Sequence, residues 1–310
     1  MKIGIVTVTY NSAGVLEDFF SSLERQDFKE FFLYIVDSGS TDETVSYAAS
    51  HMPAGGRLIE NKDNIGFAAG TNLGIHAALE DGCSAVLIMN NDVVFGPDLI
   101  SQLALFLTRN DCDMTTPLMY FHDPSNRIWA AGGTFITWRG DVNLHRGMGQ
   151  KDIGQYNSPE RVAFAPLCCV LIRRKVFDTI GLLDEEFFTY AEDADFMYRC
   201  MKRGISLWYV PNAKLWHKVS SLTGNLSDFA IRYSIRGRFY FLHKHLSSFA
   251  AWFWTLAHFI DFALQFVLMK NSKRVMILKY RAALEGYRVY RKAGARGEKE
   301  AETVNGYLLL

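Results

Sequence analysis

Apolar and polar positions alternate in blocks along the first third of the chain. Three apolar runs are rich in β-branched residues, as in strands buried in a parallel sheet: Lys2–Thr9, Phe32–Asp37 and Ala85–Met89. Helical patterns lie between and after them, at Val15–Gln26, Thr41–Ala49 and Gly66–Leu79. The alternation predicts an α/β fold with a mixed, mainly parallel sheet and a functional site at the carboxyl ends of its strands.

Two of these helical patterns carry further local signals. Ser40, with Glu43 three residues later, predicts a capping box at the start of the second helix. Gly66, Gly70 and Gly74 recur at every fourth residue, so they form one smooth stripe that allows close packing on a strand. The first strand is not followed by the G-x-G-x-x-G spacing, which disfavours a dinucleotide-binding dehydrogenase.

The pattern is less regular in the middle of the chain. Trp138–Arg161 has weak periodicity and several Gly residues, which predicts a long loop that is mobile or functional. A helix is predicted from about Ala191 to Arg203. Ser206–Val210 is predicted to be the last core strand, with Trp216 and His217 after a short turn.

The C-terminal quarter differs from the rest in charge. Residues 1–225 contain 19 Lys or Arg and 27 Asp or Glu, whereas residues 226–297 contain 13 and 3. An acidic body joined to a basic region indicates two parts with different tasks. We therefore predict a main domain over residues 1–225, a basic, aromatic-rich helical region over 226–297 and a tail over 298–310.

The segment Leu246–Met269 is long enough to span a bilayer, but His258, Asp261 and Gln265 give it one polar stripe. We therefore expect a helix in the membrane interface, between basic groups that suit an anionic leaflet: Arg232, Arg236, Arg238 and Lys244 before it, and Lys270, Lys273, Arg274, Lys279 and Arg281 after it. The alternative is packing on the main domain or on a second subunit, which would give a homo-oligomer. No nucleic-acid partner is expected, because no recognition motif accompanies the basic charge.

Length and composition place the chain among globular proteins. Its 310 residues are 49% hydrophobic and 21% charged, which excludes a disordered chain. The five cysteines are odd in number and have no metal-binding spacing, and no secretory signal follows Met1. A reducing, cytoplasmic compartment is therefore expected rather than a disulfide framework.

Polar residues gather where the predicted strands end. The three clusters are Thr9-Tyr10-Asn11, Asp37-Ser38-Gly39-Ser40 and Asn90-Asn91-Asp92. The same residue types are also common turn formers. Because the carboxyl ends of parallel strands share one edge of a sheet, we favour a binding site over three separate turns.

Three carboxylates occupy four positions at the start of the later helix: Glu192, Asp193 and Asp195. Like charges this close oppose one another's ionisation, whereas a helix N-terminus favours the charged form. Asp195 precedes Arg199 by four residues, so the two can form an ordinary surface pair. Local structure does not explain Asp193, which is therefore a candidate general base. The alternative is an acidic helix start with no function.

These features, in this order, resemble the family 2 glycosyltransferases with the GT-A fold, and most of all their rhamnosyltransferase-like members. The matching pieces span about residues 1 to 220: the three strand-end clusters, Thr41-Asp42, Asn64-Ile65-Gly66-Phe67-Ala68-Ala69-Gly70-Thr71-Asn72, Gly132-Gly133, Leu182-Leu183-Asp184-Glu185-Glu186-Phe187-Phe188, Glu192-Asp193-Ala194-Asp195 and Trp216-His217. Each piece is weak alone, whereas the ordered set is specific. The resemblance implies inverting transfer of a sugar, such as rhamnose or a related hexose, from a nucleotide diphosphate to a hydroxyl of a glycan or lipid-linked glycan.

The resemblance also implies roles for particular residues. A dTDP- or UDP-sugar would be bound by Thr9, Tyr10, Asn11, Asp37, Ser38, Asn64, Gly66, Asn72 and Asn91. Asp92, with His217 as a second ligand, would hold Mg²⁺ or Mn²⁺ on the diphosphate. Asp193 would take the proton of the acceptor hydroxyl, and the residues expected beside the acceptor or supporting the site are Glu192, Asp195 and Trp216. Asn90 stands where many relatives have a first metal-binding aspartate, so one anionic ligand is lost.

The implied place of action is the cytoplasmic face of the cell membrane, where a peripheral enzyme would meet an acceptor carried on a polyprenyl diphosphate. Two other functions compete with this one. A sugar-phosphate nucleotidyltransferase should have a Gly-rich loop with a basic residue after the first strand, and Asn11-Ser12-Ala13-Gly14 has none. A non-catalytic membrane scaffold would have no use for Asp92 and Asp193.

Overall fold

The chain forms two compact units. The computed structural model describes residues 1–219 and 227–307, with side chains as far as residue 295. The sheet unit contains residues 1–135, 143–185 and 192–222, and the helical unit contains residues 136–142, 186–191 and 223–310. Two short segments from the middle of the chain therefore belong to the helical unit, which the sequence analysis did not predict. The predicted boundary after residue 225 lies outside the described residues.

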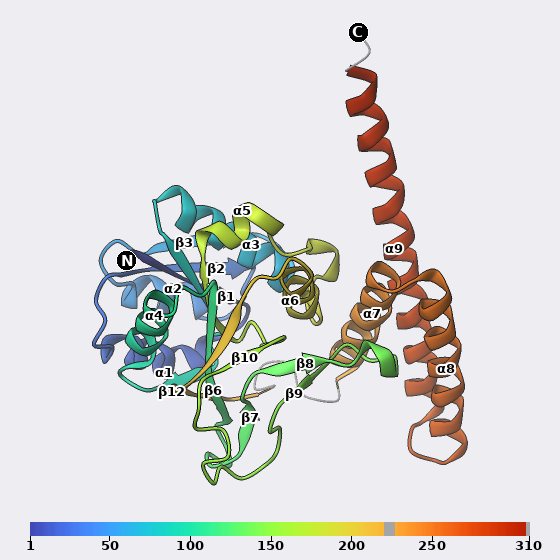
Figure 1. Ribbon diagram of the computed structural model, residues 1–310, viewed down its shortest axis with the longest axis horizontal. Helices are drawn as coiled ribbons and strands as arrows, with labels where there is room; N and C mark the ends of the chain where they lie inside the picture. The colour runs from blue at the N-terminus through green and yellow to red at the C-terminus, as the bar shows by residue number, and fades with distance from the viewer. Residues whose placement is uncertain (220–226, 308–310) are drawn as a thin grey trace. The chain divides into compact units, whose positions relative to one another are not determined.

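The sheet unit is built on a ten-stranded mixed sheet (Figure 1). Its main path is β10 (Glu160–Val162), β12 (Leu207–His217), β6 (Met114–Phe121), β11 (Cys169–Arg173), β4 (Ala85–Met89), β1 (Ile3–Thr9), β2 (Phe31–Ser38) and β3 (Arg57–Asn61). The other pairings are β5 (Val93–Phe95) with β12, β7 (Ile128–Ala130) with β6, and β8 (Gly133–Phe135) with β9 (Asn143–His145). Because β1, β2, β3, β4, β6 and β12 run in one direction, their carboxyl ends share one edge.

Helices cover both faces of this sheet. They are α1 (Ala13–Glu24), α2 (Thr44–His51), α3 (Gly66–Glu80), α4 (Leu99–Arg109), α5 (Arg174–Ile180) and α6 (Glu192–Lys202). Successive residues of β1 point to opposite faces. Accordingly, Ile5 joins a core with Phe19 of α1 and Leu103 of α4, whereas Val6 and Val8 meet α3. The predicted α/β layers are confirmed.

The glycine stripe of α3 packs directly on β1. A Cβ atom added at Gly70 would lie 2.9 Å from Val8 Cγ1, and one added at Gly74 would overlap the side chain of Val6. The prediction of close helix-to-strand packing is therefore confirmed. This packing fixes the N-terminal half of α3 beside the carboxyl end of β1, where the polar clusters lie.

Two local predictions were wrong. The capping box does not form, because α2 begins at Thr44 and the Ser40 hydroxyl bonds to Asp37 instead. Trp216 and His217 do not follow a turn: β12 continues to His217 through a bulge after Val210. Proline cannot donate to a sheet ladder and is tolerated at bulges, and residue 211 is a proline.

The long stretch predicted as a loop from Trp138 to Arg161 is more ordered than expected. It contains a one-turn 3₁₀ helix, η1 (Thr137–Arg139), together with β9 and the start of β10. These strands are only three residues long, which is too short for a visible alternation of polar and apolar positions. Pairing stabilises both strands: β9 pairs with the nearby β8, and β10 pairs with the distant β12.

The helical unit consists mainly of α7 (Asp228–His245), α8 (Ser248–Val267) and α9 (Lys273–Tyr307). The predicted helix at Leu246–Met269 is confirmed as α8, and the predicted start of the tail at residue 298 falls within α9. Of the helices that the structure describes, α8 alone is long and apolar enough to cross a membrane. Only 17% of its apolar window is buried within the protein.

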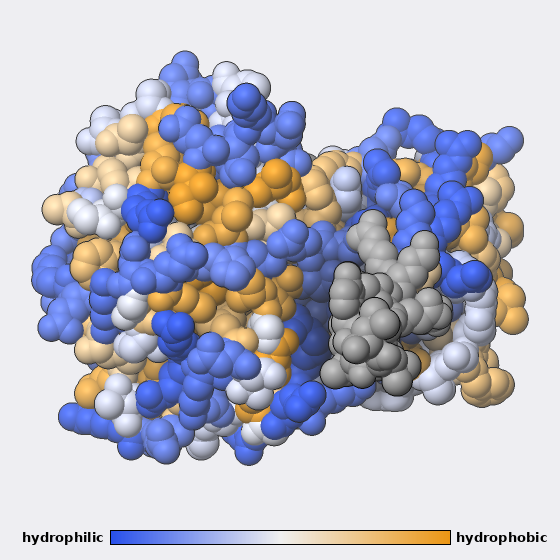
Figure 2. All heavy atoms as spheres, turned by 90° about the horizontal axis from the view of Figure 1, so that it is seen from above, coloured by the Kyte–Doolittle hydropathy of each residue, from blue (hydrophilic) through white to orange (hydrophobic). Residues whose placement is uncertain are grey.

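One face of α8 is apolar and exposed. We call it the outer stripe; its members are 51% to 83% exposed and recur at helical spacing: Phe249, Phe253, Leu256, Ile260, Leu264 and Val267. Hydrophobic side chains, orange in Figure 2, accordingly lie along the right-hand rim of the helical unit. Polar residues of the predicted stripe of α8 make hydrogen bonds within the helical unit instead. His258 bonds to the carbonyl of Gly140, and Lys279 of α9 donates to Gln265.

Candidate active site

The carboxylate of Asp37 is the centre of a hydrogen-bond network at the end of β2. Its Oδ1 accepts from Thr9 Oγ1 at 2.8 Å and from Ser40 Oγ at 2.5 Å, and its Oδ2 accepts from the Ser40 backbone N–H at 2.8 Å. An ionised carboxylate offers about four lone-pair positions. Asp37 is therefore buried and held rigidly, with capacity for about one more hydrogen bond.

Two asparagines brace the loops around this network. Asn11 has a φ of 48°, and its Oδ1 accepts from the Thr41 backbone N–H at 2.8 Å. Asn91 Nδ2 donates to the Val8 carbonyl at 2.8 Å and to Ser12 Oγ at 3.2 Å. Both side chains fix one strand-end loop against another, so they give the edge of the sheet its shape.

Ser38, Asn64 and Gly66 join β2 to the start of α3. Ser38 Oγ accepts from the Ile65 backbone N–H at 3.3 Å, and Asn64 Oδ1 accepts from that of Gly66 at 2.9 Å. Gly66 has a φ of 81°, in the left-handed region that favours glycine. These residues therefore set the direction in which α3 leaves the strand-end edge.

Asn72 connects α3 to the segment that leads toward α6. Its Nδ2 donates to the Leu183 carbonyl and to Glu185 Oε1, both at 2.9 Å, and its Oδ1 accepts from the Leu183 N–H at 3.0 Å. Both ends of the amide are thus engaged within the sheet unit. The contact with a donor nucleotide remains a prediction, whereas the observed contacts make Asn72 an anchor for residues 183–185.

Tyr10 differs from these bracing residues because its side chain is 45% exposed. It directly follows Thr9 at the end of β1 and therefore stands beside the Asp37 network. An aromatic ring in that position offers a flat apolar face with a polar tip. It is suited to stacking on a nucleobase or a sugar.

Asp92 and His217 form a buried pair at the same edge. The His217 Nε2 lies 3.1 Å from Asp92 Oδ1, and the two strands that carry them pair at Val93 and His217. Burial opposes protonation of His217, but the adjacent Cys168 thiol and the Asp92 carboxylate outweigh it and raise its pKa to about 10. The Trp129 ring packs edge-on against the imidazole at 4.4 Å. Neither Cys168 nor Trp129 was predicted from the sequence.

A divalent cation shared with a substrate would have to displace the proton of His217, because only a neutral imidazole ligates a metal. Among the described residues, no group of three or more His, Cys, Asp or Glu side chains could hold a metal ion. Mg²⁺ in particular is often held by one or two protein ligands together with substrate phosphates and water. The buried Nδ1 of His217 has no hydrogen-bond partner among the described residues, so the ring is not fixed from its other side.

Trp216 points away from that pair, as expected for neighbours on a strand. Its indole N–H donates to the Ser125 carbonyl at 3.1 Å, and its ring stacks on Tyr120 at 5.6 Å. These contacts give Trp216 a packing role. Its predicted place near the acceptor remains a prediction.

Asp195 has a structural role on α6. It forms the predicted pair with Arg199, with Nε 2.9 Å from Oδ2, but Asp195 is fully buried, so the expectation of a surface pair was wrong. The same guanidinium donates to the carbonyls of Ile180 and Leu182, both at 2.7 Å. The pair therefore fastens the chain before α6 to the helix itself.

Glu192 and Asp193 are adjacent acids in an apolar environment. Burial raises the pKa of Glu192 to about 8, helped by the charge of Asp193, and burial also raises the pKa of Asp193 to about 6. Glu192 Oε2 is buried without a hydrogen-bond partner among the described residues. Two negative charges this close oppose each other, so the pair carries one charge more easily than two.

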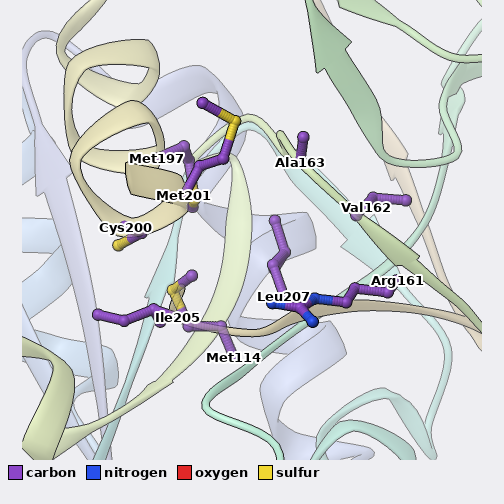
Figure 3. A pocket seen from close by; sticks show the side chains of 9 residues that line it. All are labelled: Met114, Arg161, Val162, Ala163, Met197, Cys200, Met201, Ile205 and Leu207. Carbon is purple, nitrogen blue, oxygen red and sulfur yellow. The ribbon is translucent and has the colours of Figure 1, made fainter. Parts of the chain in front are cut away.

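Helix α6 also borders a cavity. Met197 and Met201 of this helix line a cavity of about 250 Å³ together with Met114 and Leu207, the first residues of β6 and β12 (Figure 3). The cavity itself contains none of the predicted site residues.

Comparison with known proteins identifies the family. A family model described as Glycosyl transferase family 2 matches residues 4–181, more than half of the chain. The chain belongs to glycosyl transferase family 2. The match includes the Asp37 network and Asp92 and ends before α6 and His217.

This glycosyltransferase has similar relatives in several organisms. The N-acetylglucosaminyl-diphospho-decaprenol L-rhamnosyltransferase of Mycobacterium tuberculosis is 28% identical over 245 residues, which cover 71% of this chain and 77% of that protein. The dTDP-rhamnosyl transferase RfbF of Shigella flexneri is 21% identical over 257 residues, which cover 79% and 81%.

A solved structure shows the fold. The mannosyltransferase PcManGT from Pyrobaculum calidifontis, in complex with GDP-Man and Mn²⁺, matches at a TM-score of 0.53 and 14% identity, covering 99% of this chain and 80% of that chain. The glycosyltransferase therefore has the GT-A fold, and the predictions of family and fold are both confirmed. Glycosyl transfer is favoured over the nucleotidyltransferase and scaffold alternatives.

Proposed function

We propose that this glycosyltransferase moves rhamnose or a related hexose, with inversion, from a dTDP- or UDP-sugar to a hydroxyl of a lipid-linked glycan. The observation that supports the mechanism is the adjacent acid pair at the start of α6, where Glu192 is buried, Asp193 is half-buried and the pKa of both carboxyl groups is raised. The names of the two relatives support the choice of rhamnose, and one of them includes a diphospho-decaprenol acceptor.

Asp193 is the general base in this mechanism. Its carboxylate takes the proton of the acceptor hydroxyl while the hydroxyl oxygen forms a bond to the anomeric carbon of the donor. The bond between that carbon and the diphosphate oxygen breaks, and its electron pair leaves with the nucleotide diphosphate. Because attack and departure occur on opposite faces of the carbon, the configuration inverts.

The strand-end edge is the donor site. Asp37 has capacity for about one more hydrogen bond, which suits the ring N–H of a pyrimidine, and the exposed ring of Tyr10 suits stacking on the base or sugar. The other residues predicted to bind the donor hold the loops around Asp37 and Tyr10 in place. Specificity for the base therefore depends on one carboxylate whose position is fixed by Thr9 and Ser40.

Asp92 and His217 would hold the divalent cation, Mg²⁺ or Mn²⁺. When bound, such a cation neutralises the charge that develops on the departing diphosphate. With Asn90 in place of a second carboxylate, the protein supplies one anionic ligand there, so we expect metal affinity to depend strongly on bound nucleotide.

The outer stripe of α8 docks on a membrane surface at the cytoplasmic face. Exposed basic residues follow it, at Lys270, Lys273 and Arg274, as an anionic leaflet requires. The opposite face of α8 packs on α7 and α9, so the helix lies along the surface rather than crossing it. Of the basic residues expected before α8, three form ion pairs inside the unit instead: Arg232, Arg236 and Arg238. A second copy of the chain is the competing occupant of the stripe.

A thermal-shift panel tests the proposed function. We expect one pyrimidine nucleoside diphosphate to stabilise the enzyme in the presence of Mn²⁺, by about 2.7 kcal/mol at a hundredfold excess over Kd. Asp92→Ala should abolish the metal-dependent part of the shift. Asp178→Ala, at an exposed acid on α5, is the matched control and should keep it. An equal response to all nucleotides, with or without metal, would contradict the donor site.

A further inference from the structure

Residues 186–191, which we call the base loop, end immediately before Glu192 and Asp193. Although the sheet unit continues on both sides of it, the base loop belongs to the helical unit. Its conformation is unusual: Phe188, Tyr190 and Ala191 have φ values of 67°, 64° and 70°. Non-glycine residues in this region cost about 1 kcal/mol or more each and persist only where the surroundings impose them.

Helix α7 makes the contacts that impose this conformation. The Tyr233 ring stacks on Phe188 at 4.9 Å, and the Tyr240 ring contacts Phe187 at 4.6 Å. Arg236 Nη1 donates to the Phe187 carbonyl at 2.9 Å. With Gly237, these residues follow the helical spacing i, i+3, i+4 and i+7, so they form one continuous face of α7.

Gly237 is the point of closest approach. A Cβ atom added there would lie 2.6 Å from the Tyr190 carbonyl oxygen and 3.2 Å from Ala191 Cβ. A separation under 3.0 Å from a backbone atom requires the backbone to move. The helix backbone is thus pressed against the two residues that precede Glu192.

Arg236 is itself held in place from the other side. Its Nε lies 3.3 Å from Glu285 Oε1 of α9, and it is only 8% exposed. Glu285 also binds Arg232, with both carboxylate oxygens accepting at 2.9 Å. The guanidinium is therefore oriented before it meets the carbonyl of Phe187, which also accepts from the Thr189 N–H at 2.8 Å within the base loop.

We propose that the face Tyr233, Arg236, Gly237 and Tyr240 of α7 positions the general base, with Arg236 and Gly237 as positioning residues. This inference rests on the proposed role of Asp193. The torsions of the base loop set the direction in which the chain enters α6, and therefore where the Asp193 carboxylate stands. Proton transfer needs that carboxylate within about 3 Å of the acceptor hydroxyl, and a displacement of about 1 Å costs about 100-fold in rate.

Gly237→Ala tests the proposal by adding a single methyl group. We expect kcat for transfer to fall by about 10- to 100-fold, while the donor KM and the thermal shift with nucleotide and Mn²⁺ stay unchanged. Gly294→Ala is the matched control, since a Cβ at this other helical glycine of the same unit meets nothing within 4 Å. It should leave kcat and KM at wild-type values.

Arg236→Lys is the second variant and decides the question if Gly237→Ala does not fold. Lysine keeps the charge but cannot pair with Glu285 and the Phe187 carbonyl in the same fork. We expect a fall in kcat with an unchanged donor KM. In an Asp193→Asn background, neither variant should lower the residual rate further, because the base is already absent.

The outcomes separate the two proposals. If Asp193→Asn transfers sugar at the wild-type rate, the proposed base is wrong and the positioning role falls with it. If Asp193→Asn is inactive but Gly237→Ala and Arg236→Lys keep wild-type kcat, only the positioning role is overturned. The positioning role is also overturned if Gly237→Ala and Arg236→Lys lose activity only in proportion to their loss of folded protein or of donor binding.

Discussion

The sheet unit and the helical unit distribute their apolar side chains in opposite ways. In the sheet unit, Ile3 and Ile5 of the central strand are fully buried and the polar residues gather at one edge. In the helical unit, Phe249 is 83% exposed, whereas Arg236 and His243 are buried. A contiguous exposed row of apolar side chains is typical of an interaction surface, for which a membrane is the proposed occupant.

The two units also differ in the charged residues that they contain: acids distinguish the sheet unit and basic residues distinguish the helical unit. The acids of the sheet unit stand at the active edge, and burial raises the pKa of both Glu192 and Asp193. In the helical unit, the basic residues either pair internally, as Arg232 does with Glu285, or lie exposed on α9. The proposed chemistry and the proposed docking therefore lie in separate units, and the base loop is one of the segments through which the chain passes between them.

The largest effect is expected in the sheet unit. Asp193→Asn preserves the shape of the side chain but cannot take a proton, so kcat should fall by about 10²- to 10⁴-fold with donor affinity unchanged. Glu192→Gln is the matched control, because the neutral amide replaces a side chain that is already protonated near pH 7. It should retain activity close to wild type in the same radiolabelled-sugar transfer assay. Equal losses in both variants would remove the distinction between the two acids.

The next effect concerns the outer stripe. Ile260→Glu places a charge on the exposed face of α8, and losing one apolar side chain costs about 1.5–3 kcal/mol of lipid partitioning, or about 10- to 100-fold. Binding is measured by co-sedimentation with vesicles that contain phosphatidylglycerol. Leu105→Glu is the matched control, since Leu105 is similarly exposed on α4 of the sheet unit.

Two results would contradict the docking assignment. Vesicle binding that survives Ile260→Glu but is lost in Leu105→Glu would move the lipid contact to the sheet unit. A wild-type enzyme that ignores vesicles and sediments as a dimer, with Ile260→Glu monomeric, would replace the membrane with a second copy. In each case the exposed stripe remains a contact surface, but its occupant changes.

The fold was predictable where the signals are local. The runs Ile3–Thr9 and Ala85–Met89 are apolar on both faces because both faces are covered, and that requirement is visible in the residues themselves. The strand-end clusters were predictable for the same reason, since parallel strands share one edge. The predicted capping box failed because the Ser40 hydroxyl bonds to the carboxylate of Asp37, three residues earlier in the sequence.

The parts that could not be predicted depend on contacts between residues far apart in the sequence. Nothing near Phe187 in the sequence indicates that Arg236 will bind its carbonyl, 49 residues away. The same is true of Gly140, whose carbonyl bonds to His258. Arg236 looked like one of a row of basic residues beside a membrane helix. Only its partner Glu285, on another helix, shows that it points inward.

The pH dependence of the rate tests the acid pair further. Asp193 must be ionised to act, so kcat/KM should rise as pH increases through about 6. Ionisation of Glu192 at higher pH places a second negative charge beside the base, which makes Asp193 more basic and gives no reason for the rate to fall. Glu192→Gln should therefore keep the rise. A profile that is flat from pH 5 to 7 would contradict the assignment of Asp193.

The smallest effect tests how tightly the sheet unit is packed. A Cβ at Gly74 would overlap Val6 of β1, and overpacking of this kind costs about 1–3 kcal/mol. Gly74→Ala should therefore lower the melting temperature measured by calorimetry, without changing kcat per folded molecule. Gly14→Ala, on α1, meets nothing within 4 Å and should be neutral or slightly stabilising, because alanine favours a helix by about 1 kcal/mol over glycine. If Gly74→Ala were as stable as Gly14→Ala, α3 would stand farther from β1 than described, and the donor edge that it shapes would be wider.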